Sequence, residues 1–437
     1  MNTFIWGFEG ESGTRIVETI SGDKSFNVVV WISDSKNCTH NVFDFILAKD
    51  NIHSERPYNI ECFAKCYQEG LNSFINMFTR HFHSYARTYH DFIDAFNILF
   101  QKIYSLTIEN KTELVIFSNI PHEGPDFISY LIAKELGIKT LMLFQAPVAK
   151  DNRFFILREI SDFETLENIG QIEKFALQKI EKTHVGTYFY MRNLKILNEE
   201  SLAQNWLLYL KLLLKRDFWT LSLSVSKHLR YRSFQHRVFA LSKKIDWKND
   251  LKFVYFPLAM QPELTTSALG GIFNDQMLAI ERLSHLLPED WKVIVKENPK
   301  QTDMQRGEWF FSRLSHLRNV ILIDPHESSH FLIEKSQFVA VVTGTAGWEA
   351  IKGGKKALVF GFAWFMSLPG VIKYHESLTF DSILSYSFTH EELEIAYSRL
   401  LSKVVRGVVD PLYIDGDVTF NSDSNAQHVL NCLKRFI

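Results

Sequence analysis

The sequence predicts an α/β protein with two domains, each built around a parallel sheet. Short apolar runs alternate with helix-length segments in two separate regions, which is typical of β-α-β units. The 437 residues suffice for two domains, and a composition of 46% hydrophobic and 22% charged residues is that of a globular protein. The stretch between the two regions shows no β alternation, so we expect helices there. The predicted parts are residues 1–156, 157–249 and 250–437.

The first region begins with a strand within Met1–Gly10, a segment that lacks the basic start and apolar core of a signal peptide. A second strand, Asn27–Ile32, precedes a long aromatic stretch from about residue 59 to 108 that we expect to be mostly helical. The strands Glu113–Ser118 and Thr140–Phe144 then flank a predicted helix over residues 126–136.

The second region is more regular, because a helix-length segment follows each of its first four strands. Repeated β-α units with short connections indicate a nucleotide-binding half of Rossmann type. The predicted strands are Phe253–Phe256, Lys292–Val295, Val320–Ile323, Phe338–Val342 and Ala357–Phe360.

The turn after the fourth of these strands has the composition of an anion site. Gly344 and Gly347 would let the backbone approach a ligand, and Thr343 and Thr345 add hydroxyl donors. The helix that starts there presents free amides and the positive end of its dipole. Glu349, near the start of that helix, could bind the two hydroxyls of a ribose. A tight β-to-α turn without any ligand has the same pattern and remains an alternative.

Polar segments also follow three other predicted strands, at residues 119–126, 257–267 and 296–299. Ligands of open α/β sheets bind beyond the carboxyl ends of the strands, so these segments are expected to line a cleft. Lys296 and the Thr343–Gly347 turn would form a phosphate cradle that stabilises a departing nucleotide, although Lys296 could also be a plain surface lysine. No acidic pair has obvious metal-ligand spacing, and we infer no metal requirement.

Three carboxylates on these loops are candidates for catalysis of glycosyl transfer, which commonly needs a carboxylate as base or nucleophile. They are Glu123, Asp126 and Glu263. Asp126 could instead be the N-cap of the helix that follows it. His122 is a candidate base or phosphate ligand.

Together these motifs resemble bacterial capsule and surface-polysaccharide biosynthesis proteins, close to their retaining Kdo-transferase-like members. The resemblance is carried by Phe256–Thr266, Gly270–Gln276, Val295–Pro299 and Val342–Ala350, with Ile120–Asp126 as a motif of the N-terminal domain. It implies a GT-B-like arrangement, in which two Rossmann-like domains face a cleft.

The resemblance also implies the residues that bind the donor, a cytidine monophosphate-activated 3-deoxy-ulosonic acid such as Kdo. Gln261, Pro262 and Glu263 match a Gln-Pro motif, and Lys296 and Pro299 match a His-Pro segment in which Asn298 replaces the usual histidine. Asparagine can donate a hydrogen bond to phosphate but carries neither charge nor a proton. The implied phosphate-binding turn contains Thr343, Gly344, Thr345 and Gly347, with Glu349 near the ribose.

The expected function is therefore a glycosyltransferase that acts on a glycan or lipid-linked glycan acceptor at the cytoplasmic face of the membrane, without a cofactor. Glu263 or Glu123 would supply the catalytic carboxylate, with His122 and Asp126 organising the acceptor side. Two alternatives remain. One is a transferase or epimerase that uses a uridine-linked sugar; the other is a non-catalytic glycan-assembly protein, which Asn298 favours.

Residues 211–248 hold ten Lys or Arg against two acidic residues, with aromatic residues interleaved. This segment predicts either a solvated helical face or a surface for anionic lipid or glycan. The formal net charge of −2 gives no case for nucleic-acid binding. The four cysteines do not form a disulfide framework, and the pair Cys62 and Cys66 lacks partners at zinc-type spacing.

Overall fold

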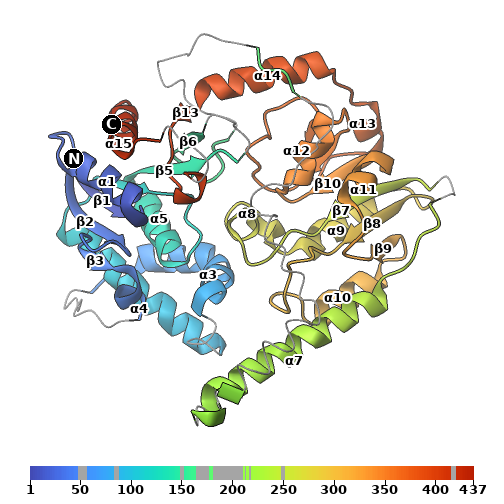
Figure 1. Cartoon of the computed structure of the whole chain (residues 1–437), viewed down its shortest axis with the longest axis horizontal. Helices are drawn as coiled ribbons and strands as arrows, with labels where there is room; N and C mark the ends of the chain where they lie inside the picture. The colour runs from blue at the N-terminus through green and yellow to red at the C-terminus, as the bar shows by residue number, and fades with distance from the viewer. Residues whose placement is uncertain are drawn as a thin grey trace. The chain divides into compact units, whose positions relative to one another are not determined.

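The structure is a computed structural model, and it describes residues 1–47, 57–82, 88–147, 152–163, 177–180, 210–211, 213–215, 218–247, 251–414 and 420–437. The chain forms two compact units (Figure 1). Unit 1 comprises Met1–Gln178, Pro262–Leu269 and Glu394–Ile437, and unit 2 comprises Lys179–Gln261 and Gly270–Leu393. Each unit contains one sheet that is wholly or mainly parallel. The predicted α/β class with two Rossmann-like domains is therefore confirmed.

The sheet of unit 1 has the order β13-β6-β5-β4-β1-β2-β3. Its four central strands are parallel and nearly all buried, because Val, Ile, Leu and Phe occupy both faces. Polar residues that follow these strands therefore share one edge of the sheet. The strands are β1 (Asn2–Trp6), β2 (Asn27–Ser33), β3 (His40–Asn41), β4 (Leu114–Phe117), β5 (Lys139–Gln145), β6 (Arg153–Leu157) and β13 (Val405–Arg406).

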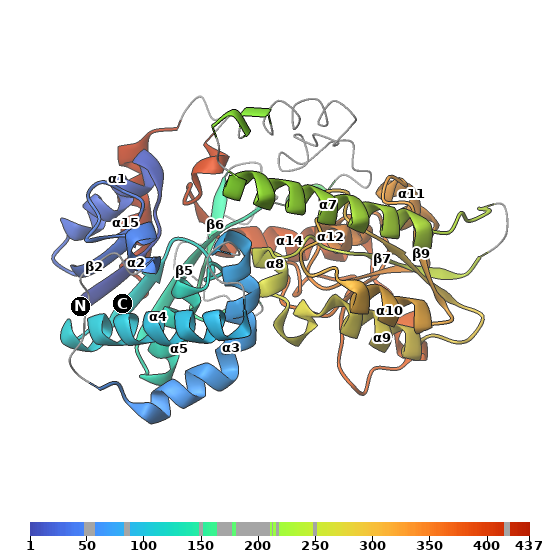
Figure 2. The same cartoon turned by 90° about the horizontal axis from the view of Figure 1, so that it is seen from below.

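Helices cover both faces of this sheet. α1 and α15 lie side by side on one face, where Ile16 and Val17 share a core with Ala426 and Val429 (Figures 1 and 2). α5 packs against α3 and α4 on the other face. The helices of the unit are α1 (Gly10–Ser21), α2 (Val42–Ile46), α3 (Ile60–Phe82), α4 (Tyr89–Glu109), α5 (Pro125–Glu135), α8 (Leu264–Ser267), α15 (Ser422–Leu433), most of α14 (His390–Lys403) and the 3-10 turn η3 (Pro411–Tyr413).

Two features of unit 1 differ from the sequence prediction. The expected long helical stretch over residues 59–108 is divided between α3 and α4, and a capping box formed by Thr88 and Asp91 starts the second helix. The expected second domain ended at residue 437, whereas residues 394–437 belong to unit 1. β13 adds antiparallel to β6, and α15 packs on α1, so the chain returns to complete the first unit.

The sheet of unit 2 is parallel throughout, with the order β12-β11-β10-β7-β8-β9. β7 therefore lies between β10 and β8, and the turns after these three strands are neighbours. The strands are β7 (Phe253–Pro257), β8 (Lys292–Lys296), β9 (Val320–Ile323), β10 (Phe338–Val341), β11 (Ala357–Val359) and β12 (Val371–Lys373).

One face of this sheet carries the main core of unit 2, to which α7, α9, α10 and α13 contribute Phe234, Ile280, Phe311 and Ile383. α11 and α12 pack together on β7, β10 and β11. The helices are α7 (Phe218–Leu241), α9 (Gln276–Leu286), α10 (Glu308–His316), α11 (Ser329–Lys335), α12 (Thr345–Lys352), α13 (Phe380–Ser385) and the 3-10 turn η2 (Gly271–Asn274).

Most of the expected helical segment 157–249 lies outside the described residues, and so do Arg216, Asp217 and Lys248 of its basic part. Within the described ranges, no helix is both long enough and apolar enough to cross a bilayer.

Candidate functional site

In unit 2, the predicted donor-site residues lie at the carboxyl ends of β8 and β10. Lys296 is the last residue of β8, is only 7% exposed, and its Nζ lies 3.3 Å from the carbonyl oxygen of Pro325. Burial lowers the pKa of Lys296, while the nearby carboxylates of Glu327 and Asp324 oppose that shift. A desolvated ammonium group beside an open strand end is suited to bind phosphate.

Glu349 lies in α12, the helix that begins directly after the Thr-Gly turn. Burial raises the pKa of its carboxyl group, and the positive charges of His330, Lys352 and Lys296 oppose this shift. The structure thus brings Glu349 and Lys296 within electrostatic reach of each other, as the sequence predicted. His330, at the start of α11, was not predicted; its Nδ1 lies 4.0 Å from Oε2 of Glu349.

The turn itself divides its tasks differently from the prediction. Gly344 is the N-cap of α12, and a Cβ there would contact only Val341, at 3.9 Å. Gly347 is packed: a Cβ there would come within 2.9 Å of Phe365, and its N–H donates to the carbonyl oxygen of Gly344 over 3.0 Å. Gly347 is therefore explained by packing of the helix against its neighbours rather than by approach to a ligand.

Asn298, which replaces the expected histidine, belongs to a tight turn after β8. Its Oδ1 accepts from the N–H of Lys300 over 2.9 Å, and its own N–H donates to Oε1 of Glu297 over 2.8 Å. These bonds fix the backbone and the amide oxygen. The Nδ2 group remains to donate to a phosphate oxygen, since it has no hydrogen-bond partner within the described part of the chain.

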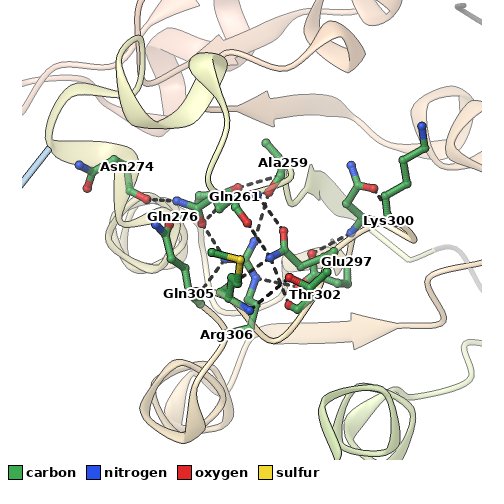
Figure 3. Close-up of polar contacts among 12 residues, drawn as sticks. Ala259, Gln261, Asn274, Gln276, Glu297, Lys300, Thr302, Gln305 and Arg306 are labelled. Atoms are coloured by element: carbon green, nitrogen blue, oxygen red, sulfur yellow. Dashed lines mark hydrogen bonds and ion pairs between the residues drawn. The ribbon is translucent and has the colours of Figure 1, made fainter. Parts of the chain in front are cut away.

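Gln261 is 4% exposed, and each of its polar atoms is bonded within the protein (Figure 3). Its Oε1 accepts from Arg306 Nη1 (2.6 Å) and Gln276 Nε2 (2.7 Å). Its Nε2 donates to the carbonyl oxygen of Asn274, and its backbone N–H and C=O both bond the side chain of Gln301. This geometry favours a positioning role for Gln261 over direct contact with a donor. Pro262, the next residue, begins the short segment grouped with unit 1.

In unit 1, the two carboxylates predicted as catalytic lie on one arginine. Nη1 of Arg80 is 3.3 Å from Oε1 of Glu123, and Nη2 is 3.2 Å from Oε2 of Glu263. Arg80 comes from α3, and Glu263 is the residue before α8, a helix that packs against α3. The backbone N–H of Glu263 lies 3.3 Å from Thr266 Oγ1, so Glu263 begins α8, a position that the sequence did not reveal.

His122 faces an acceptor at each ring nitrogen. Its Nδ1 lies 2.7 Å from the carbonyl oxygen of Ile120, and its Nε2 lies 3.1 Å from Oε1 of Glu123. Burial alone would lower the pKa of His122, but the hydrogen bond and charge of Glu123 outweigh it and the pKa is raised. A protonated His122 satisfies both acceptors, so it acts as a cation beside Glu123 rather than as a free base.

Asp126 holds the loop that carries these residues. Its carboxylate accepts from the backbone N–H groups of His122 (2.8 Å), Glu123 (2.9 Å) and Phe127 (2.8 Å). The N-cap of α5 is Gly124, so Asp126 is not the N-cap that the sequence offered as an alternative. Its contacts fix the shape of the loop.

Glu9 belongs to the same edge of unit 1 and was missed by the sequence reasoning. It follows β1 in a sharp turn where Gly7, Phe8 and Gly10 have φ of 78°, 62° and 68°. Burial raises the pKa of Glu9, and the carboxylates of Asp34 and Glu123 raise it further. The available signal was the pair of glycines directly after the first strand.

Comparison with known proteins supports part of the sequence resemblance. Residues 236–381, about a third of the chain, match the family model described as "Capsule polysaccharide biosynthesis protein". This stretch contains the Gln261, Lys296 and Thr343 motifs, and over it the predicted resemblance is confirmed. The Ile120–Asp126 motif lies outside the match. No curated protein shows significant similarity to the chain.

Several solved structures are distantly similar. One is the β-Kdo 2,7-transferase of KpsC from Thermosulfurimonas dismutans, with TM-score 0.34 and 11% identity over 76% of this chain and 89% of that one. Another is the UDP-GlcNAc 2-epimerase from Methanocaldococcus jannaschii, with TM-score 0.24 and 10% identity over 99% of both chains. A glycosyltransferase from Rickettsia africae has TM-score 0.27 and 11% identity over 100% of this chain and 97% of that one. These similarities are too low to transfer an activity to this chain.

Proposed function

We propose that the chain is a glycosyltransferase of bacterial surface-polysaccharide biosynthesis. The donor is a nucleotide-activated sugar, specifically a CMP-activated ulosonic acid such as Kdo, and the acceptor is a glycan or a lipid-linked glycan. The observation that carries the proposal is the placement of Lys296, Asn298 and Glu349 beside the Thr-Gly turn. All of them lie within the stretch that matches the capsule-biosynthesis family model.

The chemistry that this group supports is capture of a departing nucleotide. When the bond from the anomeric carbon to the phosphate oxygen breaks, its electron pair stays on the phosphate, where negative charge grows. Lys296, the Asn298 amide and the first turn of α12 are donors that are already in place for this charge. Since Lys296 supplies the cation, we propose that transfer needs no metal ion.

A retaining reaction needs a carboxylate that attacks the anomeric carbon and is then displaced by the acceptor hydroxyl, which loses its proton. Glu123 lies between two cations, His122 and Arg80, whereas Glu263 pairs with Arg80 alone. Two cationic partners withdraw more charge from a carboxylate and make it a weaker nucleophile. We therefore propose Glu263 as the catalytic carboxylate. Glu123 would be the group that orders Arg80 and His122.

The remaining parts of the proposal concern location. We propose that the protein acts in the cytoplasm at the inner face of the membrane, with α7 as its contact. No acidic residue occurs in Phe218–Leu241, and Phe218 and Leu229 are each 61% exposed among the basic side chains of this helix. Exposed apolar residues interleaved with Lys and Arg are typical of surfaces that bind anionic bilayers.

A thermal-shift panel of CMP, CDP, UMP and UDP against the purified protein tests the function. A ligand that binds the folded state raises its apparent stability by about 2.7 kcal/mol at a hundredfold excess over the dissociation constant. A shift with CMP alone supports the ulosonic-acid transferase. A shift with UDP alone favours the uridine-linked transferase or epimerase. No shift with any nucleotide favours the non-catalytic assembly protein, for which the replacement of histidine by Asn298 is the specific observation.

A further inference from the structure

Unit 2 contains a buried ion pair that none of the predicted motifs includes. Nε of Arg306 lies 2.8 Å from Oε2 of Glu297, and the two side chains are 0% and 2% exposed. The guanidinium group also lies over the ring of Phe310, 4.6 Å from its centroid. Withdrawing both charges from water is costly, and an apolar pair of similar size is often at least as stable. Stability alone therefore does not explain this pair.

The pair joins two loops that are far apart in the chain (Figure 3). Toward the loop after β7, Arg306 donates from Nη1 to Oε1 of Gln261 (2.6 Å) and from Nη2 to the carbonyl oxygen of Ala259 (3.2 Å). Toward the loop after β8, Glu297 accepts from Arg306 with one oxygen and from the N–H of Asn298 with the other. Only the planar fork of an arginine serves all these acceptors together.

Gln276 and Gln301 complete the connection. The Gln276 side chain bonds both the N–H and the C=O of Ala259, each over 2.8 Å. The Gln301 side chain bonds both the N–H (2.8 Å) and the C=O (3.0 Å) of Gln261. The loop after β7 thus has its backbone held from two sides, in the manner of a strand held by its neighbours. Arg306 links this held loop to the turn that presents Asn298.

We propose that Arg306, with Glu297, is a positioning residue that fixes the loops after β7 and β8 in the geometry that binds the nucleotide. It acts through Gln261 and Asn298 and does not itself touch the ligand. The part of the proposal that concerns nucleotide rests on the proposed function. The part that concerns loop geometry does not.

The test compares the double variant Glu297→Gln/Arg306→Met with the wild-type protein. Removing Arg306 alone would leave a buried, unpaired carboxylate and risk unfolding. The double variant has no buried charge, and the new glutamine can still accept from the N–H of Asn298. The bonds of Arg306 to Gln261 and Ala259 are lost. The matched control is Glu281→Gln/Arg313→Met, which removes another Arg–Glu pair of unit 2, a partly exposed one outside both loops.

Hydrogen exchange of the full-length protein is the first readout. In the double variant, amides of residues 258–261 and 297–305 are expected to exchange about tenfold faster or more, while β7 and β8 keep their protection. The control pair should leave both loops unchanged. If the two loops keep wild-type exchange in the double variant, or if the whole of unit 2 loosens uniformly, the positioning role is overturned.

CMP titration is the second readout. With the fold intact and the loops released, binding is expected to weaken about 10- to 100-fold, as expected when binding groups are displaced by about an ångström. Wild-type affinity in a variant with loosened loops would overturn the link to the nucleotide. If the wild-type protein binds no CMP, the proposed donor is wrong, and the exchange result still decides whether Arg306 positions the loops.

Discussion

Nη2 of Arg80 lies 3.2 Å from Oε2 of Glu263, although the two residues come from distant parts of the chain. The same guanidinium group holds Glu123 through Nη1. The two carboxylates that the sequence offered as rivals for one catalytic role are therefore neighbours that share a cation. Their difference lies in their other contacts, since His122 pairs with Glu123 alone.

Replacing Arg80 by methionine is expected to reduce activity much more than stability. The three side chains are partly exposed, so the ion pairs contribute only about 0.2–1 kcal/mol to folding. Donor hydrolysis or transfer should fall about tenfold, because the carboxylates lose charged hydrogen bonds that orient them. Initial rates and unfolding midpoints measure the two effects. Lys65→Met, which removes the exposed pair with Glu135 from the same helix, is the control.

Glu263→Gln is expected to lower the transfer rate by about 10²- to 10⁴-fold, and Glu123→Gln by less than about tenfold. The amide of glutamine keeps the size of the side chain but cannot attack carbon. Rates of donor consumption measure both effects, and mass spectrometry of the protein mixed with donor should detect a glycosyl adduct at Glu263. An equal loss in both variants, or an adduct at Glu123, would reverse the assignment.

How far the sequence predicted this arrangement depends on the distance over which each contact forms. Lys296 and Glu349 were predicted correctly to be near each other, because both follow parallel strands and such strands end at one edge of the sheet. Arg80 could not be predicted, since it lies in the middle of an amphipathic helix and only tertiary packing brings it to Glu123.

Gln261 shows the opposite limit. Its motif suggested a ligand contact, but the side-chain amide is saturated by Arg306, Gln276 and Asn274. Similarly, the return of residues 394–437 to unit 1 depends on packing of α15 against α1. Neither element contains a local signal for its partner. Patterns along the chain thus located strand ends, and the partners of individual side chains required the fold.

Lys296→Met is expected to weaken CMP binding about 10- to 100-fold, the value of a charged hydrogen bond of about 1.5–3 kcal/mol. Stability should hardly fall, because burial disfavours the charge of this lysine and the methionine side chain fits an apolar strand end. Calorimetric titration measures the affinity. Lys292→Met, at the other end of the same strand, is the control, and equal affinities in the two variants would remove Lys296 from the nucleotide site.

The contribution of His122 to stability should decrease as the pH rises. Its pKa is raised in the folded protein, so protonation favours the fold. This contribution is fully present below the unfolded pKa of about 6.5 and is lost as the pH rises through the folded value. Denaturant unfolding of the wild type and His122→Gln at about pH 6 and pH 8.5 should show a smaller difference at the higher pH. A difference that is constant or grows with pH would contradict a protonated His122.

Charge reversal on α7 is expected to reduce binding to anionic vesicles. Lys227 and Arg232 are exposed on this helix, and each basic residue near an anionic bilayer contributes about 1 kcal/mol. Lys227→Glu/Arg232→Glu should therefore weaken binding to phosphatidylglycerol vesicles roughly 30-fold or more in a sedimentation assay.

The matched control is Lys24→Glu/Lys139→Glu, which makes the same change of net charge at exposed sites of unit 1. Wild-type binding should weaken with added salt, because salt screens charges at this separation. It should be absent with neutral phosphatidylcholine vesicles. Equal loss in both double variants would show that net charge rather than α7 governs the contact. Binding that resists salt would mean that Phe218 and Leu229 dominate the contact, because burial of apolar side chains in a bilayer does not depend on charge screening.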